Sequence, residues 1–408
     1  MNKITFVFVL LMVFVVPFEE QMAIESFQSV TRLFGFMAII TGFFAVAIQG
    51  RIRRPPLTII FLWLFWAWSV LSMGWTISSD HSLVRIPTYT ALAIFVWLVW
   101  EFASTFPRQV LLIWAYIFGY CISLADQIFS FHGASLVQVG EEESRFAGGG
   151  LNANDLAYVG AVTIPLTLFL ALRVVKNPIL RLCCWPLVPL ATLGIVLTGS
   201  RGGTIALVTA VSVLVFSLRR ATWAFRIMFV AAGLLGAALV TRLAPEKTIE
   251  RVTEGTESHT FQLRQLIWAA ALERWGESPI TGWGTGTFRV AVWGAGGGYI
   301  AHNAFLTILV ETGLVGLGFF LGAALMTFYC VCRAPPEDRP FFWAILAVWF
   351  LASMVSPWEY SKSGWLMFSL VTNICMTLRA TEGNRQAPRS PPMAVLVTPY
   401  GNSRLRHA

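Results

Sequence analysis

Apolar stretches follow one another along almost the whole chain, and most of the polar connections between them are short. The stretches are about 15–25 residues long, and about 20 apolar residues suffice for an α-helix to cross a bilayer. The pattern therefore predicts an all-α, polytopic membrane protein with about 12 transmembrane helices and a long outer loop that contains short helices. The predicted spans are residues 4–18, 30–49, 57–75, 85–103, 109–128, 153–172, 182–199, 203–218, 227–243, 301–329, 340–356 and 364–378.

The charged residues of the connections divide between the two sides of the predicted helix bundle. If the N-terminus lies inside, the arginine-rich connections all fall on the inner side, as the positive-inside rule requires. These connections are residues 51–54, 108, 173–181, 219–226 and 333–339. We therefore expect both termini on the inner side, with the first apolar stretch retained as a helix. Two longer segments, 129–152 and 244–300, then lie outside.

The composition agrees with a membrane protein and argues against a nucleic-acid-binding role. Of the 408 residues, 56% are hydrophobic and 12% are charged, which is about half the charged fraction of a soluble domain. The positive charges lie mainly in short connections and form no basic stripe with interleaved aromatics. We expect one integral membrane domain over 1–378. Residues 379–408 are rich in Pro, Arg and Ser, which predicts a disordered tail on the inner side.

The outer segment 244–300 is the longest polar stretch between apolar runs. Good helix formers without Gly or Pro predict a helix over 261–274. Arg264 and Trp268 are four residues apart, so they share one face of this helix. Glycines end the helix and recur up to His302. Because binding and catalytic residues concentrate in connecting segments, we expect the chemistry of the protein here.

Two side chains of this region are candidates for that chemistry. His302 opens a predicted helix at the outer interface, where an imidazole can transfer protons near neutral pH. The alternative is an interfacial histidine that only makes hydrogen bonds. Arg264 can hold a phosphate with its planar, bidentate fork. The alternative is a solvated charge on a helix surface.

Further candidates lie earlier in the chain. Arg201 stands between two apolar stretches with almost no loop. A charge at or below the headgroup level is costly, so this arginine is a candidate site residue, with snorkelling to the headgroups as the alternative. Arg145 is a candidate anion contact in the first outer segment. Asn154 or Asp155 is a candidate N-cap for the helix that follows.

The sequence shows no metal or cofactor site. The four aspartates are scattered, no Asp-x-Asp pair occurs, and the six cysteines lie in or beside apolar stretches without the spacing of a zinc site. The chain also has no phosphate-binding loop of the ATPase type. These features predict neither a metal-dependent nucleotide-sugar transferase nor an ATP-driven transporter.

Four short elements, in order along the chain, resemble motifs of the O-antigen ligase superfamily. The clearest is His302-Asn303, followed by nine residues, Gly313, two residues and Gly316. Upstream, the stretch Arg264–Trp268 precedes a Pro-x-x-Gly-x-Gly sequence and a phenylalanine, in the order that the family shows.

The other two elements precede the long outer segment. The sequence Thr198–Gly202 resembles the Thr-x-Ser-Arg-Gly element of the family. The sequence Asn152–Ala157 resembles its Pro-Asn-x-x-Ala element, with Ala153 where proline is usual and Asn154 in the asparagine position. Together the four elements span about residues 145–320, which is the part of the membrane domain that is similar to the family.

The superfamily includes lipopolysaccharide O-antigen ligases, O-antigen and exopolysaccharide polymerases and protein O-oligosaccharyltransferases. The resemblance implies a glycosyltransferase of the bacterial inner membrane whose outer segments face the periplasm. It would move a glycan from undecaprenyl diphosphate to an acceptor hydroxyl on lipid A–core or on a growing polysaccharide. The expected activity is O-antigen ligation to lipid A–core. An O-antigen or exopolysaccharide polymerase is the alternative within the family, and a polysaccharide or lipid transporter is the alternative from another class.

The resemblance also implies roles for the candidate residues. His302 would accept the proton of the acceptor hydroxyl, and Arg264 and Arg201 would bind the diphosphate and stabilise its charge as the glycosidic bond breaks. Such a reaction needs no metal or cofactor, and a single attack without a protein nucleophile inverts the sugar carbon. The remaining expected contacts to the substrate are Arg145, Asn154, Asn303 and Trp268.

Overall fold

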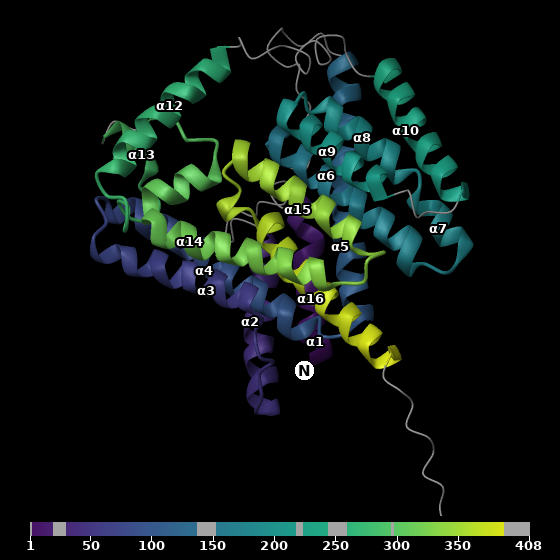
Figure 1. The fold of residues 1–408 in the computed structure, drawn as a ribbon, viewed down its shortest axis with the longest axis horizontal. Coiled ribbons are helices and arrows are strands. Elements are labelled where there is room, and N and C mark those ends of the chain that lie inside the picture. Colours follow the sequence, from purple (N-terminus) through teal and green to yellow (C-terminus); the bar gives the residue numbers. More distant parts are fainter. Residues whose placement is uncertain are drawn as a thin grey trace, which may run out of the picture.

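The computed structural model describes residues 2–18, 30–136, 152–217, 223–243, 259–294 and 298–386. Secondary structure within these ranges is helical, without strands, which confirms the all-α prediction. The α-helices are α1 (Asn2–Val15), α2 (Val30–Gln49), α3 (Leu57–Leu71), α4 (Ser79–Phe102), α5 (Phe106–Leu136), α6 (Ala153–Phe169), α7 (Pro178–Cys184), α8 (Leu187–Leu197), α9 (Arg201–Ser217), α10 (Trp223–Leu243), α12 (His259–Gly276), α13 (Phe288–Trp293), α14 (Ala304–Arg333), α15 (Arg339–Val355) and α16 (Lys362–Gln386) (Figure 1). Short helical turns among the described residues include η2 (Ser72–Gly74), η3 (Leu170–Val174) and η5 (Trp358–Tyr360).

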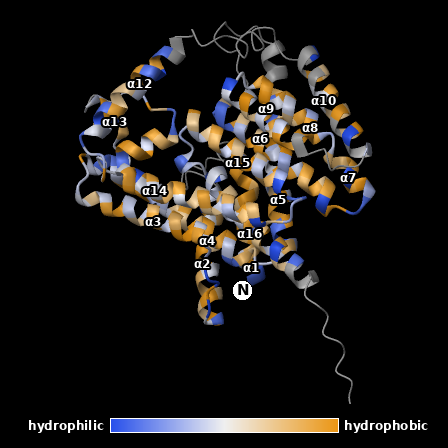
Figure 2. Ribbon diagram, in the orientation of Figure 1, coloured by the Kyte–Doolittle hydropathy of each residue, from blue (hydrophilic) through white to orange (hydrophobic). Residues whose placement is uncertain are grey.

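Several of these helices are suited to cross a membrane. By length and composition, seven described helical stretches qualify: Thr31–Gln49, Leu57–Gly74, Ser79–Phe102, Phe106–Ser130, Ala153–Val174, Pro178–Leu197 and Ala304–Arg333. Shorter apolar helices occupy Asn2–Phe18, Arg201–Val215, Arg226–Gly236 and Arg339–Val355. The structure thus confirms a polytopic membrane protein, while the total of about 12 spans stays a prediction. Figure 2 shows the apolar residues along the bundle helices and hydrophilic residues in many of the connections.

The core of the bundle is built around α6. Every residue of this helix from Leu156 to Phe169 is buried, because α8, α9 and α15 all pack against it. Elsewhere α14 lies along α3, and α16 lies along α4. At the N-terminus, α1 packs against α2 and α5 and contributes the buried Val9 and Val13. A helix that is apolar on all sides, as α6 is, can only be satisfied in such a central position.

Polar contacts define two opposite ends of the bundle. Asp155, at the start of α6, accepts a hydrogen bond of 3.0 Å from the indole of Trp358, just after α15. Arg173, at the other end of the same helical stretch, forms an ion pair of 2.6 Å with Asp338, just before α15. The helices α6 and α15 are therefore antiparallel. We call the Asp155 side the loop end and the Arg173 side the arginine end.

A break in α14 holds the connection between α12 and α13 at the loop end. Gly313 has a φ of 64°, so the helical hydrogen-bond ladder is interrupted and carbonyls become available as acceptors. The carbonyl of Val310 accepts from Trp283 N at 3.0 Å, and that of Glu311 accepts from Gly284 N at 2.8 Å. A Cβ at Gly313 would lie 2.2 Å from the carbonyl oxygen of Ile280. Only glycine fits there, which gives a physical reason for the glycine that follows the His-Asn pair.

The helices of the long outer segment form a second, smaller core with the start of α14. Figure 1 shows α12 and α13 as a group beside α14. The buried residues of this core are Ile267, Ala271, Phe288, Ala291, Ala301, Leu306 and Val310. Helices α12 and α13 are therefore packed in a fixed position against α14. Helix α12 ends at Gly276, the glycine at which the sequence predicts its end.

Two expectations concern the margins of the described ranges. The helix α16 runs to Gln386, so the segment expected to be a tail from residue 379 begins as a helix, and 387–408 lie outside the described residues. Arg145 also lies outside the described residues.

Candidate functional site

Arg201 is placed by a sharp junction between α8 and α9. The hydroxyl of Thr198 donates to the carbonyl of Ile195 at 2.6 Å and so satisfies the end of α8. Gly199, with a φ of 60°, makes the turn. Ser200 then caps α9, because its hydroxyl oxygen accepts from Gly203 N at 3.1 Å. This leaves Arg201 as the first residue of α9, where its charge adds to the positive end of the helix dipole.

Close packing of α9 on α6 brings Tyr158 to this junction. A Cβ at Gly202 would lie 2.2 Å from the Tyr158 hydroxyl oxygen, and one at Gly203 would lie 2.3 Å from the Cβ of Ala157. The two glycines of the Ser-Arg-Gly-Gly sequence therefore allow the helices to meet. The ring of Tyr158 is fixed by an edge-to-face contact with Trp358, with ring centroids 5.5 Å apart.

Arg264 and Trp268 lie on α12, and both face the start of α14. The indole N–H of Trp268 donates to the carbonyl of Ala301 at 2.8 Å. This bond fixes the backbone directly before His302. It also connects α12 to the residues that lead into α14. Trp268 therefore positions the backbone before His302, and its only polar side-chain atom, Nε1, is used in this hydrogen bond.

His302 lies between two anchors. Before it stands Ala301, held by Trp268. After it, Asn303 caps α14, because its side-chain oxygen accepts from Leu306 N at 3.1 Å. His302 itself has a φ of 47°, in the left-handed region that costs a residue with a side chain about 1–3 kcal/mol. The Asn303 cap, the Trp268 hydrogen bond and the local packing maintain this conformation, which sets the direction of the imidazole.

Arg264 acts electrostatically on both of the other candidates. Arg264 interacts with Tyr158, Arg201 and His302. Burial lowers the pKa of Arg264, and the like charge of Arg201 lowers it further. Burial also lowers the pKa of the His302 imidazole, and Arg264 adds to this effect. His302 is therefore neutral at pH 7, the form that accepts a proton.

Two buried nitrogen atoms of this group have no hydrogen-bond partner among the described residues: Nε of Arg264 and Nδ1 of His302. A buried polar atom without a partner is costly, by about 1–3 kcal/mol. A bound group with oxygen acceptors would satisfy the arginine and could also use the histidine. The arrangement is thus suited to an anion that enters from the loop end.

The structure brings together Arg201 at the start of α9, Arg264 on α12, and His302 directly before the Asn303 cap of α14. Asn303 and Trp268 lie next to them, and both of their polar side chains hold the backbone. Asn154 lies in the first turn of α6 at the same end, but the cap of this helix is Asn152, whose oxygen accepts from Asn154 N at 2.9 Å. The capping role considered for Asn154 or Asp155 was therefore wrong. The side-chain oxygen of an Asn or Asp commonly accepts a hydrogen bond from the backbone N–H two residues later, as Asn152 does from Asn154.

Sequence reasoning missed Tyr158 and Glu311. Tyr158 is a tyrosine within a predicted span, and the signal was its position three residues after the Asp of the Asn-Ala-Asn-Asp element. Glu311 is a buried carboxylate in α14 that accepts from Gly286 N at 2.8 Å and from Phe288 N at 3.2 Å. An acidic residue inside an apolar span is a recognisable signal for such a role.

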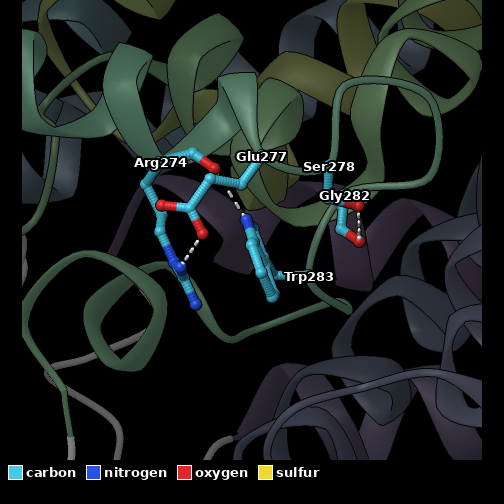
Figure 3. A network of polar contacts seen from close by, with 5 residues as sticks. All are labelled: Arg274, Glu277, Ser278, Gly282 and Trp283. Carbon is cyan, nitrogen blue, oxygen red and sulfur yellow. Dashed lines mark hydrogen bonds and ion pairs between the residues drawn. The ribbon is translucent and has the colours of Figure 1, made fainter.

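The indole of Trp283 holds the glycine-rich connection (Figure 3). Its N–H donates to the carbonyl of Arg274 at 2.9 Å. The guanidinium of Arg274 stacks 3.6 Å from the centroid of the same ring, while pairing with Glu277. The hydroxyl of Ser278 donates to the carbonyl of Gly282 at 3.0 Å. These contacts make the connection rigid around Trp283.

The described residues contain no group of three or more His, Cys, Asp or Glu side chains placed to hold a metal ion. The two charged candidates that the structure brings together, Arg201 and Arg264, are both cationic.

The fold and the site together define a class: an integral membrane protein with two arginines and a histidine gathered at one end of its helix bundle. Residues 186–321 match the family model described as O-antigen ligase. This match confirms that this part of the chain resembles the O-antigen ligase superfamily, as the motifs in the sequence indicate. The match covers Arg201, Arg264 and His302. A comparison with curated proteins gives no match.

Proposed function

We propose that this protein transfers a glycan from undecaprenyl diphosphate to an acceptor hydroxyl on the periplasmic side of the bacterial inner membrane. The observation that carries the proposal is the electrostatic contact of Arg264 with both Arg201 and His302, within the region that matches the O-antigen ligase family. The like charges of Arg264 and Arg201 repel each other, and an anion bound near both would offset this repulsion. A diphosphate at headgroup level is such an anion, and its lipid tail can lie between membrane helices.

The donor would be held by charge and by hydrogen bonds. Arg201 stands at the positive end of α9, where a phosphate is favoured by the helix dipole. Arg264 offers the unpartnered Nε and the rest of its planar fork, which matches two phosphate oxygens. Asn154 and Arg145 are proposed as further contacts to the donor.

The transfer would proceed in one step. The acceptor oxygen attacks the anomeric carbon of the glycan, and the bond between this carbon and the diphosphate oxygen breaks. The electron pair of that bond stays on the diphosphate, whose growing charge Arg201 and Arg264 stabilise. His302 accepts the proton of the acceptor hydroxyl as the new bond forms. Since no protein nucleophile intervenes, the anomeric configuration is inverted.

Within the superfamily we propose ligation of O-antigen to lipid A–core, because the matching family model carries that description. The test is the lipopolysaccharide profile of a deletion strain of the host bacterium. A ligase predicts core without O-chain and an accumulation of lipid-linked polymer. Core that carries a single repeat unit would instead identify a polymerase. An unchanged profile with lost exopolysaccharide would identify an exopolysaccharide polymerase.

A reconstituted reaction tests the chemistry itself. Purified protein in lipid vesicles is given undecaprenyl-diphosphate-linked glycan and lipid A–core, with and without an excess of chelator. We expect transfer in both conditions, because arginines rather than a metal ion would stabilise the leaving diphosphate. Loss of transfer with the chelator, restored by a divalent cation, would contradict this mechanism. Movement of the lipid-linked glycan across the vesicle without transfer would identify a transporter.

A further inference from the structure

A cavity at the arginine end of the bundle lies far from the site described above. It has a volume of about 380 Å³ and lies where the first turn of α1, the end of α2, the end of α4 and the start of α5 meet. Its lining residues are Asn2, Gln49, Arg51, Ile52, Arg53, Glu101, Phe102, Ser104 and Arg108. Most of these side chains are polar, which is unusual for a cavity next to apolar helices.

The charges of this cavity are unbalanced. Three arginines line it against one carboxylate, Glu101, so two positive charges remain. The guanidinium of Arg53 donates to the carbonyl of Trp100 and stacks 3.8 Å from its ring centroid. Arg108 donates to the carbonyl of Phe102 at 2.9 Å. These carbonyls orient the guanidinium groups but do not neutralise them.

Glu101 does not reverse this excess. Its carboxylate accepts from the backbone N–H of Arg53 at 2.9 Å and so holds the connection between α2 and α3 in place. Arg51, which precedes it in this connection, is exposed. The cavity therefore keeps a net positive charge, although Glu101 interacts electrostatically with Arg53.

Apolar side chains flank the cavity. Ile48, on the last turn of α2, is 72% exposed, and Ile52 is 58% exposed. Ile48 is one of several exposed apolar residues of α2, which include Phe43 and Phe44, and Ile52 lies in the connection that follows this helix. A polar, cationic pocket beside an exposed apolar helix face matches a molecule with an anionic head and a hydrocarbon tail.

We propose that this cavity binds an anionic phospholipid of the cytoplasmic leaflet by its headgroup phosphate, with the acyl chains along α2. Basic pockets between membrane helices on the cytoplasmic side commonly hold anionic headgroups. Arg51, Arg53 and Arg108 contact the phosphate, while Asn2 and Gln49 offer hydrogen bonds to the rest of the headgroup. A soluble phosphate has the same charge but would leave the apolar face of α2 without a role.

The test is native mass spectrometry of the purified full chain with phosphatidylglycerol or phosphatidylcholine of the same acyl chains. We expect preferential retention of phosphatidylglycerol. Arg51→Gln should weaken its binding about five-fold, the effect of one basic side chain near the membrane surface. Arg54→Gln is the matched control, because Arg54 is exposed in the same connection but does not line the cavity, and it should leave binding unchanged. Glu101→Gln keeps an acceptor for Arg53 N but removes the negative charge, so it should tighten binding.

Three outcomes would overturn the proposal. The first is equal retention of the two lipids. The second is an equal loss in the Arg51→Gln and Arg54→Gln variants, which would indicate a general effect of surface charge. The third is full displacement of phosphatidylglycerol by millimolar inorganic phosphate, which would identify a soluble-anion site. Size-exclusion profiles confirm that each variant is folded, and if Arg51→Gln is not folded, the opposite effect of Glu101→Gln decides.

Discussion

Arginines lie at both ends of the helix bundle, and their surroundings differ. At the arginine end, Arg173 pairs with Asp338 and Glu337 at 2.6 Å each, so its charge is neutralised within the protein. At the loop end, Arg264 has Arg201, Tyr158 and a neutral histidine as its electrostatic neighbours. Arg173 and Arg264 are both partly buried, so the degree of burial does not distinguish their surroundings. The two arginines therefore differ in their charged neighbours, because Arg173 pairs with two carboxylates whereas Arg264 interacts with a second arginine.

The largest expected effect is at His302. His302→Gln removes the proton acceptor while a side-chain amide remains, and we expect glycan transfer to fall by about 10²–10⁴-fold. The measurement is the rate of transfer in vesicles, with expression and size-exclusion profile as checks on folding. His81→Gln is the control, because His81 lies at the same end of the bundle and bonds only to Ser78 within the described residues. Near-normal activity in His302→Gln would remove this residue from the mechanism.

The same substitution at both ends tests the comparison directly. Arg264→Lys keeps the charge but loses the fork, and we expect the rate of transfer to fall by about 100-fold. Arg173→Lys can keep one of its two ion pairs, so we expect nearly unchanged transfer. If both variants were equally active, the fork would have no role and the two ends would not differ in function.

The pH profile tests the environment of His302. Because burial and Arg264 both lower the pKa of this imidazole, transfer should begin to fall only below about pH 6.5, the ordinary histidine value. Below the pKa, the rate should fall about tenfold per pH unit, as for a single required base. The rate in vesicles is measured between pH 5 and 8, with Arg173→Lys as a variant that should keep the same midpoint. A midpoint above the ordinary histidine value would contradict the arrangement.

A smaller effect is expected where the backbone before His302 is held. Trp268→Phe keeps the ring but removes the N–H that bonds to Ala301, a loss of about 1 kcal/mol. We expect kcat to fall about tenfold through misplacement of the imidazole, with little change in the KM for the lipid-linked donor. Trp275→Phe removes an indole N–H from the same helix, bonded to Pro279, and serves as the control. A changed KM with an unchanged kcat would instead indicate a direct contact of Trp268 with the substrate.

The smallest effect concerns stability. Burial raises the pKa of Glu359 to about 8 from an ordinary value of 4.5, with Glu311 adding to the shift and Arg85 opposing it. The folded protein therefore keeps a proton on this carboxyl that the unfolded chain releases, so its stability contribution is full below about pH 4.5 and is lost as the pH rises towards 8. Glu359→Gln should raise the melting temperature more at pH 8 than at pH 5.

The control for this measurement comes from the arginine end. Glu337 is exposed and pairs with Arg173, so Glu337→Gln should leave the pH dependence of the melting temperature as in the unchanged protein. A flat difference between Glu359→Gln and the unchanged protein over this pH range would show that Glu359 is ionised in the fold.

Much of the architecture was open to prediction because the bilayer imposes it. Apolar stretches of sufficient length must become helices in lipid, since every backbone polar group needs a partner there. The helix of the outer segment was also predictable, because its helix formers end at a glycine. The number of spans was harder to predict, because hydropathy shows where a chain is apolar but not where a helix is too short to cross the membrane.

For the candidate site, too, some features could be predicted from the sequence and others could not. The sequence alone determined that these three residues are unusual, because Arg201 and His302 stand at the edges of apolar stretches and Arg264 lies in the longest polar segment between them. Their common location was decided only by tertiary packing, through Gly202 against Tyr158 and through the hydrogen bond from Trp268 to Ala301. Likewise, the hydrogen bonds of Trp268 and Asn303 could not be predicted, because the pattern of apolar and polar positions does not identify their acceptor and donor groups. A local pattern records what each residue is, whereas the meeting of α6, α9, α12 and α14 depends on side chains distant in the chain. This meeting places Arg264 near enough to Arg201 and His302 to act on both electrostatically.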